Sequence, residues 1–186
     1  MNKGTLKNVR GDVTEPLITF KNEIVIIPHC CNNLGKMGKG VALSLKKKWG
    51  KVYNIYKDMK TKNIGADDYL LGDISCAMVE FYPNITIPKI IVVNMIGQDG
   101  TVSKDNPIPI KYQALVKCME KIKEKIKRNI SSQNKPVIHC CKFGSDLAGG
   151  NFDFILELIR ELWLEHGLDV VIYEWESDKD KWGEIV

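Results

Sequence analysis

The sequence lacks an apolar run of the roughly 18 residues that a membrane span requires. It also lacks a secretory signal, because the opening MNKGTLKNVRGDVTEP is polar where such a signal carries its apolar stretch. We therefore expect a cytoplasmic protein that has no membrane partner.

Cysteine pairs of the CxxC type, which are typical of zinc ribbons, are also absent. The six cysteines instead include two adjacent pairs, a spacing that does not suit a disulfide framework. We predict that all of these thiols are reduced. The cysteines are Cys30, Cys31, Cys76, Cys118, Cys140 and Cys141.

A strong charge of one sign is missing as well. The chain has 27 basic and 23 acidic residues, and the net charge of +4 falls short of the excess that nucleic-acid-binding proteins carry. Two lysine-rich runs, 45–51 and 120–129, contain apolar residues at helical spacing. We interpret them as solvent faces of amphipathic helices, with a nucleic-acid surface as the alternative, and expect no nucleic-acid partner.

What is present fits one domain of ordinary size. The chain has 186 residues, and 44% of them are hydrophobic, which is enough to bury a core without covalent crosslinks. We find no domain boundary and predict a single domain over residues 1–186 with a short polar C-terminal tail.

Strands and helices alternate along the chain, which predicts an α/β domain with helices on both faces of a largely parallel or mixed sheet. Gly50 is expected to separate two helices, and Gly167 to end the last one. A buried stripe at steps of three and four predicts the third helix, through Ala114, Leu115, Cys118, Ile122 and Ile126. The expected strands are 5–10, 22–30, 69–84, 89–97, 135–141 and 168–175, with a turn near 83–88, and the expected helices are 40–50, 52–63, 110–129 and 152–167.

One pattern occurs twice: an apolar strand runs into His-Cys-Cys and then into a glycine-rich turn, at residues 26–40 and again at 137–150. In open α/β sheets, ligands bind outside the carboxyl ends of the strands. The first turn lacks the spacing of a Walker A loop, because Asn33 stands where that loop has its first glycine and Gly40 where it has Ser or Thr. Two such turns, each before a helix, favour a ligand with a diphosphate, and the alternative is a pair of ordinary strand-to-helix turns.

Three motifs in this order resemble the macrodomain family: GDVTEPL at 11–17, HCCNNLGKMGKGVALSLKKKWG at 29–50 and FGSDLAGGNF at 143–152. The resemblance implies a three-layer α/β/α sandwich with a central mixed, largely parallel sheet. It implies ADP-ribose as the ligand, bound by a monomer.

The resemblance also implies the roles of individual residues. Asp12 would receive the adenine amino group and Asn32 would contact the distal ribose, while the two turns would surround the diphosphate. Asp12 could instead initiate a turn, and Asn32 could satisfy the backbone of its loop. The implied ligand-binding residues are Asp12, Val13, Asn33, Gly35, Met37, Gly38, Lys39, Gly40, Val41, Gly144, Ser145, Leu147, Ala148, Gly149 and Gly150.

Within the family, the sequence is most similar to the ADP-ribose-1''-phosphate phosphatases, because His29 precedes Asn32 by three residues. His29 is a candidate general acid or base, although a strand histidine is also a common core residue. Asp146 stands where the family usually has glycine, and we predict that it acts as the catalytic base. The predicted catalytic residues are His29, Asn32 and Asp146.

The predicted function is therefore hydrolysis of ADP-ribose-1''-phosphate to ADP-ribose and phosphate. The alternatives are a module that captures ADP-ribose or a related signalling nucleotide without turnover, and a glycohydrolase that removes ADP-ribose from protein or DNA. Similar glycohydrolases use a lysine just after the strand that corresponds to IIVVN, and some use an acid in the second turn. Met95 and Ala148 hold these places here, which counts against that activity.

A zinc site is a further alternative for the repeated His-Cys-Cys. His29 and Cys31 would share one face of their strand, as would His139 and Cys141, and the corresponding strands are neighbours in macrodomains. Because cysteines are commonly buried without any metal, we predict no metal and no cofactor, and we interpret the repeat as two strands that deliver two ligand loops.

Overall fold

The structure, a computed structural model, describes residues 2–61, 70–83, 88–131 and 133–175. Strands and helices alternate in these ranges as the sequence predicts. The strands are β1 (Leu6–Arg10), β2 (Glu23–Asn32), β3 (Ile74–Phe81), β4 (Pro88–Gln98), β5 (Lys135–Cys141) and β6 (Asp169–Glu174). The helices are α1 (Gly40–Lys48), α2 (Gly50–Thr61), α3 (Tyr112–Asn129) and α4 (Phe152–Leu162), with short 3-10 helices η1 (Asp146–Ala148) and η2 (Leu164–His166).

The strands form one mixed sheet in the order β1-β6-β5-β2-β4-β3. Only β3, which pairs with β4, runs antiparallel to its neighbour among these strands. The carboxyl ends of the five parallel strands therefore meet at one edge of the sheet, and the loops that follow β1, β2, β4 and β5 gather there.

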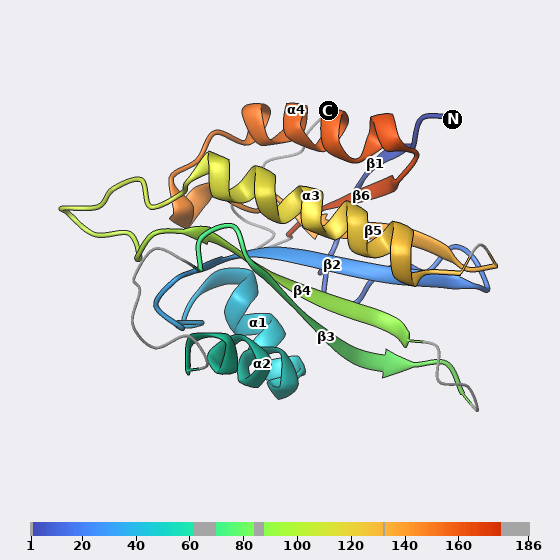
Figure 1. The fold of residues 1–186 in the computed structure, drawn as a ribbon, viewed down its shortest axis with the longest axis horizontal. Helices are drawn as coiled ribbons and strands as arrows, with labels where there is room; N and C mark the ends of the chain where they lie inside the picture. The colour runs from blue at the N-terminus through green and yellow to red at the C-terminus, as the bar shows by residue number, and fades with distance from the viewer. Residues whose placement is uncertain (1, 62–69, 84–87, 132, 176–186) are drawn as a thin grey trace.

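Helices cover both faces of the sheet (Figure 1): α3 and α4 lie on one face, and α1 and α2 lie on the other. Alternate residues of β2 explain the two layers, because successive side chains of a strand point to opposite faces. Ile24 and Ile26 pack with the helices of the first face, and Val25 and Ile27 with those of the second. The predicted three-layer α/β/α sandwich with a mixed, largely parallel sheet is confirmed.

The predicted stripe of α3 is also confirmed, since Ala114, Leu115, Cys118, Ile122 and Ile126 are all buried. The last predicted helix is shorter than expected. It ends as α4 at Leu162, the 3-10 helix η2 follows, and Gly167 closes η2 with a φ of 79°.

Most other boundaries differ by one or two residues, but β3 (Ile74–Phe81) is clearly shorter than the strand predicted at 69–84, because residues 70–72 form a turn. β2 continues to Asn32 because its pairing with β4 persists beyond Cys30, and the break between α1 and α2 falls at Trp49, since Gly50 already belongs to α2. Part of the predicted turn at 83–88 and the predicted polar tail lie outside the described residues. In the ranges that are described, no helix combines the length and the apolar character that crossing a membrane would need.

Candidate functional site

The two glycine-rich loops of the sequence motif meet at the carboxyl edge of the sheet. β2 and β5, which deliver them, are paired in parallel, with Val25 opposite Val137. A Cβ built on Gly40 would lie 3.7 Å from Leu147 Cδ1, so the start of α1 is in contact range of the second loop. The predicted convergence of the two loops is therefore what the structure shows.

Asn32 organises the first loop from within. Its Oδ1 accepts hydrogen bonds from the backbone N–H groups of Leu34 (3.0 Å) and Lys36 (3.2 Å), and its Nδ2 donates to the carbonyl of Lys36 (2.8 Å). Tyr56 of α2 lies 2.9 Å from the same Oδ1 through its hydroxyl. The sequence left two roles open for Asn32. The structure shows that Asn32 forms hydrogen bonds with the backbone of its own loop, and contact with a ribose stays a prediction.

Asn33 joins the first loop to the loop that follows β4. Its Nδ2 donates to Asp99 Oδ1 (3.0 Å), and its Oδ1 accepts from the N–H of Gly100 (2.8 Å). Lys111 Nζ lies 4.0 Å from the other carboxylate oxygen of Asp99. Sequence reasoning missed Asp99 and Tyr56, because neither belongs to a motif and both contact residues distant in sequence.

The rest of the first loop leads to the exposed start of α1. Met37 is buried, whereas Gly38, Lys39 and Gly40 are exposed. Lys39, the N-cap residue, makes no capping hydrogen bond with its side chain, and the first turn of α1 has no acidic residue. The first N–H groups of the helix, together with the positive end of its dipole, are therefore suited to an anion.

The second loop folds tightly between β5 and α4. The N–H of Gly150 donates to the carbonyl of Gly144 (3.0 Å), and a Cβ built on Gly150 would lie 2.1 Å from that oxygen, so only glycine fits there. Ala148 is buried, and its carbonyl accepts from the N–H of Ile110 (3.2 Å). Among the described residues, nothing accepts a hydrogen bond from the consecutive N–H groups of residues 144–147. These donors face no internal competitor for an anion.

Asp146 has an unusual backbone conformation in this loop. It is the one non-glycine residue with a positive φ, 49°, in the part of the chain that the structure describes, and it is exposed. A left-handed conformation is costly for residues with a Cβ, which explains why glycine would suit this position. Ser145 directs its hydroxyl to the carbonyl of Lys142 (2.6 Å).

Asp12 lies just past the carboxyl end of β1. Its Oδ1 accepts a hydrogen bond from the N–H of Thr14 (2.8 Å), which is the turn-initiating role considered from the sequence. Val13, the next residue, is buried. The second carboxylate oxygen of Asp12 is left for the predicted contact with an adenine amino group.

His29 does not reach the two loops. Its side chain is 0% exposed, and its Nε2 lies 2.6 Å from Asn94 Oδ1, while Asn94 Nδ2 donates to Ser75 Oγ (3.0 Å). Burial lowers the pKa of His29 to about 4, so the ring is neutral near pH 7. The structure thus places His29 in the core, which was the alternative weighed from the sequence, and gives no support to its predicted catalytic role.

The two histidines of the repeated motif have separate partners. His139 contacts Glu23 and Tyr173 rather than His29 or Cys31. Burial raises the pKa of the Cys30 and Cys141 thiols to about 12, so both thiols are protonated near pH 7. In the described ranges, no cluster of three or more His, Cys, Asp or Glu side chains could hold a metal ion.

Met95 lies inside a strand, in agreement with the strand predicted over 89–97, and so it does not hold a place just after the strand. β4 runs on to Gln98, and Met95 is fully buried inside it, paired with Cys30 and Ile74. Asp99 is the first residue beyond the strand. The absence of the glycohydrolase lysine stays a prediction.

Known proteins resemble this chain over nearly its whole length. It is 29% identical over 172 residues to an uncharacterised 17.5 kDa protein encoded in the tk-vs intergenic region of Enterobacteria phage T4, which covers 92% of this chain and 97% of that protein. No protein-family model matches the chain. A protein of unknown function from Bacteroides thetaiotaomicron superposes with a TM-score of 0.75 at 26% identity, covering 92% of this chain and 99% of that one.

A macrodomain protein from Streptomyces coelicolor superposes with a TM-score of 0.70 at 27% identity, covering 91% of this chain and 98% of that one. DarTG from Thermosipho africanus, whose structure contains ADP-ribose, has a TM-score of 0.66 at 16% identity, and the match covers 94% of this chain and 43% of that one. The sheet order and the helices on both faces thus define an α/β/α sandwich. More particularly, the chain has the macrodomain fold, and the resemblance inferred from its motifs is confirmed.

Proposed function

We propose that this protein binds ADP-ribose or its 1''-phosphate at the carboxyl edge of the sheet. One observation carries the proposal: the backbone N–H groups of residues 144–147 and the uncapped start of α1 meet at that edge. Backbone N–H groups and a helix N-terminus are the groups that proteins use to bind a diphosphate. The ADP-ribose held by the similar fold of Thermosipho DarTG supports the same ligand class.

The other contacts follow from the positions of two residues. Asp12 at the end of β1 would accept a hydrogen bond from the adenine amino group with its second oxygen. Asn32 Nδ2 carries two hydrogens, and Lys36 O accepts one of them, so the second is the group that we assign to the distal ribose. This assignment keeps the loop-organising role of Asn32 intact.

The finer proposal is hydrolysis of ADP-ribose-1''-phosphate to ADP-ribose and phosphate, with Asp146 as the general base for the attacking water. Asp146 is the only one of the three predicted catalytic residues that is both exposed and ionisable. A carboxylate beside an anionic ligand weakens binding by repulsion, and its backbone conformation adds strain. A catalytic role in activating water would explain why the protein tolerates both the electrostatic repulsion and the backbone strain.

Capture without turnover is the second candidate function. It is favoured by the engagement of His29 with Asn94 and of Asn32 with its own loop, which leaves Asp146 without a second acid or base. In that case the loops would recognise ADP-ribose as a signal.

Phosphorus NMR separates the two functions. ADP-ribose-1''-phosphate is incubated with near-stoichiometric protein and followed over hours, beside the Asp146→Asn variant. Growth of inorganic phosphate with wild-type protein but not with the variant would support hydrolysis. Shifted or broadened ligand signals without phosphate release would support capture, and unchanged signals would overturn ADP-ribose as the ligand.

A further inference from the structure

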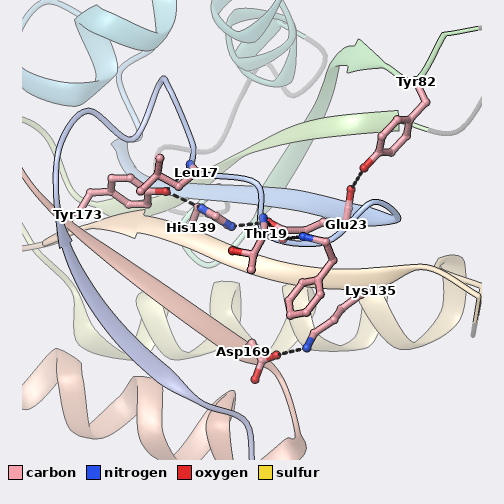
Figure 2. A network of polar contacts seen from close by, with 9 residues as sticks. Leu17, Thr19, Glu23, Tyr82, Lys135, His139, Asp169 and Tyr173 are labelled. Carbon is pink, nitrogen blue, oxygen red and sulfur yellow. Dashed lines mark hydrogen bonds and ion pairs between the residues drawn. The ribbon is translucent and has the colours of Figure 1, made fainter.

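A chain of buried polar side chains runs across β6, β5 and β2 beside the segment that contains Leu17 and Thr19 (Figure 2). Glu23 at the start of β2 is 1% exposed, His139 of β5 is 0% exposed and Tyr173 of β6 is 3% exposed. His139 Nε2 lies 2.9 Å from Glu23 Oε1, and His139 Nδ1 lies 2.9 Å from the Tyr173 hydroxyl. We refer to Glu23, His139 and Tyr173 as the buried relay.

The hydrogen bonds of the buried relay are complete for only one arrangement of protons. The Tyr173 oxygen accepts from the N–H of Leu17 (2.9 Å), so its own hydrogen goes to His139 Nδ1. His139 then carries its hydrogen on Nε2 and donates it to Glu23 Oε1. A second proton on His139 would leave the Tyr173 hydroxyl hydrogen without an acceptor. Burial, which lowers the pKa of His139, favours the same neutral state.

The relay ends on three backbone N–H groups of one segment. Leu17 donates to Tyr173, while Thr19 (2.9 Å) and Phe20 (3.1 Å) donate to Glu23 Oε2. This segment joins β1 to β2, and it begins with Gly11 and Asp12. The ring of Tyr173 also lies under its start, because a Cβ built on Gly11 would be 3.9 Å from Tyr173 Cδ1.

The start of the segment has anchors of its own. The N–H of Gly11 donates to the carbonyl of Glu174 (2.9 Å), Val13 and Thr14 are buried, and Lys48 binds the carbonyl of Thr14.

The rest of the segment has little packing to fix its shape. None of residues 15–22 is buried, and the side chains of Leu17 and Phe20 are 58% and 40% exposed. Lys135, which is paired with Asp169 (2.9 Å), lies 3.9 Å from the ring centre of Phe20 and holds the far end only. The conformation of residues 15–20 therefore depends on the buried relay, which binds the backbone at Leu17, Thr19 and Phe20.

Stabilising the sheet does not require such a relay. Removing a carboxylate from water is costly, and well-packed apolar residues in place of a buried ionic group are often as stable or more stable. What apolar residues cannot provide is an acceptor for the three N–H groups at fixed positions. The carboxylate of Glu23 is thus explained by the geometry that it imposes on Thr19 and Phe20.

We infer that Glu23, His139 and Tyr173 are positioning residues that hold residues 15–20 and thereby support the adjoining turn that presents Asp12 to the adenine of the ligand. The inference rests on the proposed function for the identity of the ligand. It assigns the relay a role in base selectivity that none of its members could have by direct contact, since all three are buried.

The first test uses Tyr173→Phe, which keeps the ring under Gly11 but removes both hydrogen bonds of the hydroxyl. Tyr82→Phe is the matched control, because the Tyr82 hydroxyl also binds Glu23, at its backbone carbonyl (2.5 Å), and does not touch the segment. Affinity is measured for ADP-ribose and for inosine diphosphate ribose, which has a carbonyl in place of the adenine amino group. We expect Tyr173→Phe to lower the preference for ADP-ribose by roughly fivefold to tenfold, the factor that one hydrogen bond commonly supplies. Tyr82→Phe should leave it unchanged.

Two further readouts do not depend on any ligand. Amide hydrogen exchange at Leu17, Thr19 and Phe20 should speed up in Tyr173→Phe and not in Tyr82→Phe. The nitrogen chemical shifts of the imidazole should show the Nε2–H tautomer of His139 in the wild type. In Glu23→Gln, the amide oxygen should still accept from the N–H groups of Thr19 and Phe20, so the amide NH2 must donate to His139 Nε2. The hydrogen of His139 should then be on Nδ1.

The outcomes are distinguishable. Unchanged exchange in Tyr173→Phe would overturn the positioning role whatever the ligand is. Faster exchange with an unchanged base preference would overturn the link to adenine. Failure of the wild-type protein to bind ADP-ribose would overturn the proposed function, and exchange alone would then decide the positioning role.

Discussion

The hydroxyl of Tyr56 lies 2.9 Å from Asn32 Oδ1, and it connects helix α2 to the centre of the first ligand loop. The same hydroxyl accepts from the N–H of Gly35 (3.1 Å) and also contacts the backbone carbonyl of Asn32. Tyr56 is 2% exposed, and burial raises the pKa of its phenol, so it remains a donor at all ordinary pH values. Tyr56 and Asn32 therefore hold the loop through neutral groups, in addition to the link from Asn33 to the Asp99 carboxylate.

Tyr56→Phe should loosen this loop. Because the change removes a buried hydroxyl with several partners, we expect the free energy of unfolding to fall by about 1 to 2 kcal/mol. Affinity for ADP-ribose should fall as well, since the loop loses its anchor. Tyr53→Phe, on the same helix, is the control and should change neither quantity by much. Equal affinity of both variants in calorimetry would mean that Tyr56 does not shape the site.

Gly38→Ala tests whether the ligand approaches the backbone of the first loop. A Cβ built on Gly38 meets nothing within 4 Å, so the unliganded fold should accept it without loss of thermal stability. A diphosphate packed against the loop would collide with that Cβ, and we expect the Kd for ADP-ribose to rise about tenfold or more. Gly50→Ala, where the added Cβ also meets nothing within 4 Å, should leave the Kd unchanged. Identical Kd values for the two variants would place the diphosphate elsewhere.

The fold could be predicted from local patterns. The stripe of α3 repeats at the helical period, and the apolar runs of β2 and β5 are typical of strands covered on both faces. The glycines indicated the two loops in a similarly local way, because glycine adopts backbone conformations that residues with a Cβ disfavour. These signals are contained in short stretches of sequence.

The candidate site was predicted less well because its key contacts are long-range. Nothing near His29 in the sequence indicates that Asn94 of β4 will lie beside it and bind its ring in the core. The strand predicted over 89–97 nearly matches β4, which runs to Gln98, and for that reason Met95 lies within the strand and cannot stand in for a residue that follows it. The contact between Glu23 and His139 joins residues 116 positions apart, and only the order of strands brings them together.

The buried position of His29 predicts how stability depends on pH. Its pKa is about 4 in the folded protein, against 6.5 for an ordinary histidine, so the unfolded chain binds more protons between these values. Stability is therefore complete above pH 6.5 and falls as the pH drops toward 4, by about 3 kcal/mol for a shift of this size. His139, whose pKa burial also lowers, acts in the same direction.

His29→Gln isolates this contribution. Glutamine retains a hydrogen-bonding group for Asn94 but does not titrate, so the variant should lose less stability than the wild type between pH 6.5 and 4. Urea unfolding at several pH values measures the difference. Because His29 does not touch the loops, ADP-ribose affinity and any phosphate release near pH 7 should be largely retained. A loss of turnover with intact binding would restore the catalytic role that the sequence suggested for this histidine.

Asp146 gives the sharpest test of chemistry at the site, because its charge and its backbone strain can be changed separately. Asp146→Asn removes the charge and keeps a residue that tolerates positive φ, whereas Asp146→Gly also relieves the strain of the 49° φ. Both should bind ADP-ribose more tightly than the wild type, and the glycine variant should gain about 1 kcal/mol in the free energy of unfolding. If the carboxylate is the general base, the rate of phosphate release should fall by roughly a hundredfold or more in both variants.

The control is Asp153→Asn, which changes an exposed carboxylate in the first turn of α4 and should behave as the wild type. Full turnover in Asp146→Asn would leave the strained carboxylate without a catalytic reason and would favour capture of the ligand.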